Sequence, residues 1–72
     1  MAKPRKIDYE KIAQNIRLER FKQKMSQDTL GRLSGVSAAT IGNIEANSEK
    51  ALFKNIVSIS IALKVDIDEI LF

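Results

Sequence analysis

Cysteine and histidine are both absent from this 72-residue sequence. Without cysteine the chain has no disulfide and no thiolate chemistry, which suits a reducing cytoplasm. Without histidine it lacks the commonest general base, and the two absences together exclude zinc sites. No apolar run is long enough to cross a membrane, and the N-terminus lacks the apolar core of a signal peptide. We therefore expect a soluble cytoplasmic protein with no metal, cofactor or evident small-molecule ligand.

Acidic residues are scarce in most of the chain. The net charge is +3, but residues 66–69 hold three of the nine acidic side chains. With these three set aside, 12 basic residues face 6 acidic ones, a net charge of +6. A basic body is the footprint expected of a protein that binds a polyanion, although a surface made basic for solubility explains the same charge.

The central stretch, residues 26–45, predicts two short helices joined by a tight turn. Ser26 and Ser37 are good N-caps, and Gly35 can take the positive φ of a C-cap. Gly31 fits a close crossing of the two helices, since a side chain there would hold them apart. Neither helix is long enough to be stable alone, so we expect them to pack together through apolar side chains. These are Leu30, Leu33, Val36, Ile41 and Ile44, and the arrangement is a helix-turn-helix.

Three further helices are predicted around this pair. The first is capped by Asp8 and ends near Gln23 or Lys24, with Ile12, Ile16 and Arg20 on its inner side. Another runs from about Leu52 to Leu63, and its period places Phe53, Ile56, Ile59 (or Ser60) and Leu63 inside. A capping box of Asp66 and Glu69 starts a last helical turn. In the loop before residue 52, Asn47 is the residue best suited to a left-handed conformation.

In order and spacing, these segments resemble the lambda-repressor-like (Cro-type, or XRE) family of helix-turn-helix proteins. The resemblance covers about residues 9–71 and is carried by IRLER, MSQDTLGRLSGVSAATIGNIE and ALKVDIDEIL. It implies an all-α, five-helix DNA-binding domain over residues 8–72, preceded by a flexible basic arm over residues 1–7. It also implies a transcriptional regulator, a repressor in our interpretation, that binds a palindromic operator in double-stranded DNA as a homodimer.

The resemblance assigns roles to particular positions. Gln27 matches a residue that holds a backbone phosphate, as its place at a helix N-terminus favours. Asn43 matches a base-reading position, and an Ala methyl can contact the thymine methyl. Because many relatives carry long polar side chains where Ala38 and Ala39 stand, direct readout is sparse and DNA shape gains weight. The full predicted DNA-binding set is Gln27, Ser37, Ala38, Ala39, Thr40, Gly42, Asn43, Asn47, Ser48, Lys50 and the arm residues Lys3, Arg5 and Lys6.

Two further sets have structural roles. Arg20 and Glu45 match a salt bridge between the first helix and the end of the third. An excess of apolar side chains near the C-terminus predicts a two-fold interface made by Val57, Ile61, Leu71 and Phe72, although these can also fold back onto their own domain. The same excess keeps open an antitoxin-like or other protein-interaction module of this fold. An enzyme is disfavoured, because the chain lacks the usual nucleophile and base and has little volume for a cleft.

Overall fold

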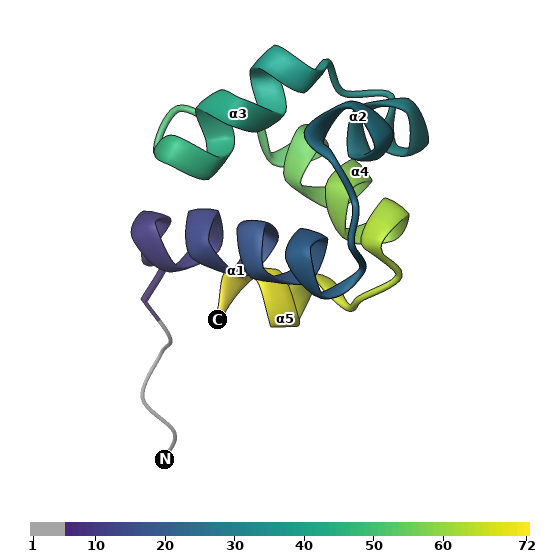
Figure 1. Ribbon diagram of the computed structural model, residues 1–72. Coiled ribbons are helices and arrows are strands. Elements are labelled where there is room, and N and C mark those ends of the chain that lie inside the picture. The colour runs from purple at the N-terminus through teal and green to yellow at the C-terminus, as the bar shows by residue number, and fades with distance from the viewer. Residues whose placement is uncertain (1–5) are drawn as a thin grey trace.

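Five α-helices make up all the regular structure of residues 6–72, the part of the chain that the computed structural model describes (Figure 1). They are α1 (Tyr9–Lys22), α2 (Gln27–Ser34), α3 (Ala38–Ala46), α4 (Phe53–Leu63) and α5 (Ile67–Leu71). The predicted all-α class is confirmed, and IVSISI belongs to a helix despite its β-branched residues. Of the predicted arm, Lys3 and Arg5 lie outside the described residues, whereas Lys6 is exposed and precedes α1.

The helices begin and end where the sequence supplies caps. The side chains of Asp8, Ser26 and Ser37 each accept a hydrogen bond from the backbone N–H three residues later, at 3.2, 3.0 and 3.1 Å. Gly35 ends α2 with a φ of 74°, a conformation that glycine adopts without steric cost. The predicted capping box begins α5. Local hydrogen bonding therefore sets most of the helix boundaries, as the sequence predicted.

One apolar core lies between the helices. Helix α1 packs on α3, α4 and α5, and α2 packs on α3 and α4. Figure 1 shows α1 and α5 together on one side of the bundle and the α2–α3 pair on the other. Six core side chains have relative exposures of 1% or less: Ile16, Leu30, Ile41, Ile59, Leu63 and Ile70. The core thus joins the helix-turn-helix to the rest of the bundle. This packing stabilises α2 and α3, which would be too short to be stable alone.

Two predicted core residues are exposed instead. Leu33 is 60% exposed, because three residues along a helix turn it about 60° away from buried Leu30. Phe53 is 64% exposed, because it is the first residue of α4 and lies at the rim of the bundle. There it lines a hollow with Tyr9 and Leu71. Helical periodicity correctly predicted that Ile56, Ile59 and Leu63 are buried. It did not show that the core ends before Phe53.

The prediction for the backbone of Asn47 was wrong. Its φ is −161°, so it leaves α3 in an extended conformation, and its side-chain oxygen accepts a hydrogen bond from the N–H of Glu49 at 2.9 Å. Among the described residues other than glycine, positive φ occurs at Lys24 and Lys64, after α1 and α4. Lys24 and Lys64 take this conformation at the ends of their helices, whereas α3 ends in an extended residue followed by a hydrogen-bonded turn, in which the Ala51 N–H donates to the Ser48 carbonyl oxygen at 3.0 Å.

Candidate nucleic-acid interface

Helices α2 and α3 cross closely at Gly31. A Cβ atom at this position would lie 2.8 Å from the carbonyl oxygen of Val36 and 3.3 Å from the backbone nitrogen of Ala38. The first distance is shorter than any ordinary carbon–oxygen contact, so the backbone of the turn would have to move. The predicted role of Gly31 is confirmed: it lets the turn fold back so that α3 lies across α2.

A buried ion pair joins this unit to α1. Arg20 donates from Nε to Glu45 Oε2 at 2.7 Å and from Nη2 to Glu45 Oε1 at 2.8 Å. Its third nitrogen, Nη1, donates to the carbonyl oxygen of Met25 at 2.9 Å, in the connection between α1 and α2. The two residues are 8% and 4% exposed. The salt bridge expected from the resemblance is therefore present, and it fixes α1, the start of α2 and the end of α3 relative to one another.

The environment keeps both members of the pair charged. Hydrogen bonding to Glu45 raises the pKa of Arg20 above its ordinary value, against the opposing effect of burial. For Glu45, burial acts to raise the pKa, but hydrogen bonds from Arg20 and Gln27, with the Arg20 charge, outweigh it and leave the pKa lowered. A buried charged pair fixes the relative positions of the helices that it joins, because breaking it leaves a buried charge without a partner.

Sequence reasoning missed two other ties to Glu45. Arg17 donates from Nη1 to the carbonyl oxygen of Glu45 at 3.1 Å, which satisfies a group at the C-terminal end of α3. Gln27 donates from Nε2 to Glu45 Oε1 at 3.3 Å. The sequence did indicate the Arg17 contact, because Arg17 precedes Arg20 by three residues and so lies on a neighbouring part of α1.

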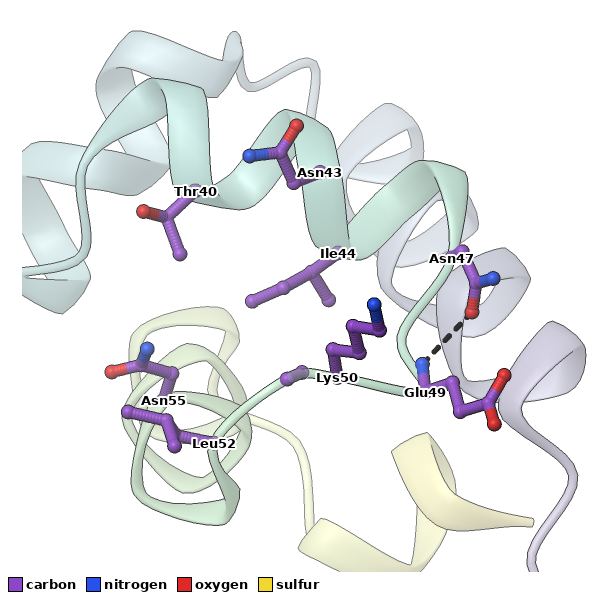
Figure 2. A pocket seen from close by; sticks show the side chains of 9 residues that line it. Thr40, Asn43, Ile44, Asn47, Glu49, Lys50, Leu52 and Asn55 are labelled. Atoms are coloured by element: carbon purple, nitrogen blue, oxygen red, sulfur yellow. Dashed lines mark hydrogen bonds between the residues drawn. The ribbon is translucent and has the colours of Figure 1, made fainter.

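The outer side of α3 is short of polar groups, as its sequence implies. Ala39 and Asn43 are exposed, and Ala38, Thr40 and Gly42 are half-buried. Asn43 extends outward from the helix in Figure 2. Ser37 and Thr40 are engaged with each other, because the Ser37 hydroxyl donates to the Thr40 hydroxyl at 2.8 Å while capping α3. Asn43 is thus the amide side chain that α3 itself presents to a partner.

A hollow of about 620 Å³ separates the second half of α3 from the start of α4 (Figure 2). Thr40, Asn43 and Ile44 line it from α3, and Asn55 lines it from α4. Lys50 extends from the loop toward α3 in this view. An exposed cation beside an outward-facing amide is the pairing expected where a protein contacts a phosphate backbone and base edges together.

Ser48 does not belong to this surface. It is 3% exposed, and its hydroxyl donates to the backbone carbonyl of Tyr9 at 2.6 Å. The Ser48 side chain is therefore engaged within the fold, and a phosphate contact by this loop stays a prediction for its backbone and its other polar groups. The residue instead fastens the loop after α3 to the first turn of α1. Its neighbours Asn47 and Lys50 are exposed, as the predicted interface requires.

No helix within residues 6–72 is both long and apolar enough to span a bilayer. What these residues present instead is the α2–α3 pair, with its close crossing at Gly31 and an exposed outer side on the second helix. A five-helix bundle containing such a pair defines the lambda-repressor-like class of helix-turn-helix domains.

Comparison with known proteins agrees with this class. The HTH_3 helix-turn-helix family matches residues 15–70. The restriction-modification controller protein C.AhdI from Aeromonas hydrophila is 30% identical, with a TM-score of 0.81 over 88% of this chain and 96% of that one. The wild-type controller protein C.Esp1396I is 27% identical, with a TM-score of 0.80 over 88% and 86%.

An HTH_3 family transcriptional regulator from Vibrio cholerae shares the fold at 24% identity, with a TM-score of 0.79 over 86% of this chain and 35% of its own. A search among curated proteins found no match. The chain belongs to the HTH_3 helix-turn-helix family of DNA-binding transcriptional regulators. The resemblance seen in the sequence is confirmed.

Proposed function

We propose that this chain is a homodimeric repressor that binds a palindromic operator through α2 and α3. The observation that carries the proposal is the outer side of α3, where Asn43 is exposed next to small side chains. An α-helix with small outward residues can enter the major groove, and an Asn amide can pair with adenine N6 and N7. Bound there, the domain blocks access of other proteins to the site, which is sufficient for repression.

Positive side chains and a helix end supply the contacts that do not depend on sequence. Gln27 is the first residue of α2, where backbone N–H groups and the helix dipole favour an anion. Lys50 is exposed on the loop after α3, and Lys6 is exposed just before α1. Such contacts position the duplex without reading its bases. Because one domain makes few base contacts, a second copy of the chain strengthens binding by doubling the number of contacts to DNA.

An exposed apolar stripe on α4 supports the dimer. Phe53, Val57 and Ile61 are four residues apart and so share one side of the helix. Ile61 is 70% exposed and Val57 half-buried. Leu71, half-buried, lines a hollow with Phe53 at one end of the stripe. The proposed interface therefore keeps Val57, Ile61 and Leu71 and gains Phe53. Phe72, the fourth residue of the predicted set, lines a neighbouring hollow with Leu71, Asp8 and Lys11, and it stays part of the proposed interface.

A duplex titration at two salt concentrations tests DNA binding. We expect the logarithm of the association constant to fall with the logarithm of salt concentration, by about 0.9 for each phosphate contacted. Asn43→Ala should cost roughly 1–3 kcal/mol on a preferred duplex and little on random DNA. Gln27→Ala should weaken both alike. Gln14→Ala, on an exposed position of α1, is the matched control and should change neither.

Two results would overturn the proposal. Binding that does not respond to salt would mean that phosphate contacts are absent. Equal losses on preferred and random DNA for both the Asn43 and the Gln27 variants would mean that α3 does not read sequence.

A further inference from the structure

The side chain of Gln27 lies across α3 at Gly42. A Cβ atom built on Gly42 would lie 3.5, 3.6 and 3.8 Å from Oε1, Nε2 and Cδ of Gln27. The Gln27 amide therefore lies next to Gly42 on the outer side of α3. A methyl group fits there at ordinary van der Waals distance, whereas a longer side chain would displace the amide. Gly42 is thus covered from this side by Gln27, and its lack of a side chain leaves room for the amide.

The neighbouring carboxylate fixes which end of the amide points where. Gln27 Nε2 donates to Glu45 Oε1 at 3.3 Å, and the same oxygen accepts from Arg20 Nη2 at 2.8 Å. A carboxylate only accepts hydrogen bonds, so the amide must present its NH₂ group to Glu45 and turn its carbonyl oxygen away. Arg20 neutralises the carboxylate, so Glu45 adds no unpaired negative charge next to the Gln27 amide.

We propose that Glu45 and Gly42 are positioning residues that hold the Gln27 amide in the orientation in which it contacts DNA. Glu45 takes one N–H of the amide and so leaves the second N–H for a phosphate oxygen. Gly42, which has no side chain, leaves room for the amide to lie against α3, where it adds a polar group beside Asn43 that the small residues of α3 do not provide. The buried ion pair therefore acts on DNA binding through one side chain. This inference rests on the proposed DNA-binding function.

A double-mutant cycle on duplex binding tests the role of Glu45. Gln27→Ala and Glu45→Met, which removes the acceptor, should each weaken binding by about tenfold, the size expected for losing one hydrogen bond to a charged group. The double variant should bind no worse than Gln27→Ala alone, because Glu45 then has nothing left to position. Circular dichroism at the assay temperature selects conditions in which every variant is folded. Independent, multiplying losses would overturn the inference, since a purely structural Glu45 would act in either background.

A second pair of variants avoids the ion pair altogether. Gly42→Ala and Gly42→Leu both improve helix propensity, but only leucine is long enough to displace the Gln27 amide. Gly42→Leu should bind DNA about tenfold more weakly than Gly42→Ala. In the Gln27→Ala background the leucine should have no further effect. If it still weakens binding there, it obstructs DNA directly, and the positioning role of Gly42 is refuted.

The two levels of the proposal fail in different ways. A wild-type chain that binds no duplex at any salt concentration overturns the DNA-binding proposal and this inference together. A wild-type chain that binds with a steep salt dependence, but shows independent losses in both cycles, leaves DNA binding intact and overturns the positioning role alone.

Discussion

Arg20 and Glu45 form a two-point ion pair, with Nε 2.7 Å from Oε2 and Nη2 2.8 Å from Oε1. They are 25 residues apart in the chain and lie on α1 and α3. This two-point contact holds the helix proposed to read DNA at a fixed angle to the bundle. Both residues are buried, so changing one partner at a time tests the energetics of the pair.

Breaking the pair from either side should destabilise the fold. Arg20→Met leaves the buried Glu45 carboxylate without its positive partner. Glu45→Gln leaves the buried Arg20 guanidinium without its negative partner. Each should lower the free energy of unfolding by about 3–5 kcal/mol, measured by urea denaturation. Replacing both by well-packed neutral residues should cost less than the two single losses added together. Additive losses would mean that the two side chains do not interact.

Acid should remove the stabilisation that Glu45 provides. Its pKa is lowered in the folded chain, so its contribution is fully present above the ordinary glutamate pKa of about 4.3. The contribution is lost as pH falls through the lower folded value. The difference in unfolding free energy between wild type and Glu45→Gln should therefore shrink below about pH 4. Glu49→Gln, at an exposed position, is the control. A difference that stays constant into strong acid would contradict this account.

Two glycines should respond to alanine with opposite signs. Gly31→Ala places a methyl group 2.8 Å from the Val36 carbonyl oxygen, and we expect it to lower the unfolding free energy by roughly 1–3 kcal/mol. Gly42→Ala meets only ordinary contacts and should raise stability by up to about 1 kcal/mol. Thermal and urea unfolding of the two variants, compared in parallel, decide it. A stable Gly31→Ala would show that α2 and α3 do not need their close crossing.

Sequence reasoning was strongest where a property is local. N-caps at Asp8, Ser26 and Ser37 were predicted because each side chain bonds a backbone group three residues away. The partner of Arg20 was predicted because an arginine on an apolar stripe needs an acid and the family pattern supplies Glu45.

Apart from the backbone of Asn47, the properties that were missed depend on distant parts of the chain. Ser48 reads as a polar loop residue until Tyr9, 39 residues earlier, is placed beside it. Leu33 and Phe53 follow a helical period, but the period does not show where neighbouring helices stop covering a surface. The amide of Gln27 over Gly42 needed the crossing of two helices to be known.

The α4 stripe gives a direct test of the dimer. Ile61→Lys should produce a folded monomer in sedimentation experiments and bind an operator much more weakly, because a charge is costly to bury in an apolar interface. Leu18→Lys is the matched control, since Leu18 is an exposed leucine on α1, outside the α4 stripe. It should leave assembly unchanged. A wild-type chain that stays monomeric at high micromolar concentration, both alone and on DNA, would refute the interface.

Selection of bound duplexes from a random pool tests the central claim, sequence-specific binding by a homodimer, most directly. We predict enrichment of an inverted repeat whose half-sites are separated by about 10–10.5 base pairs, centre to centre, or a multiple of that spacing. The same selection with Asn43→Ala should lose preference at one base pair in each half-site. A pool that shows no enriched sequence, or only a single asymmetric half-site, would contradict the claim.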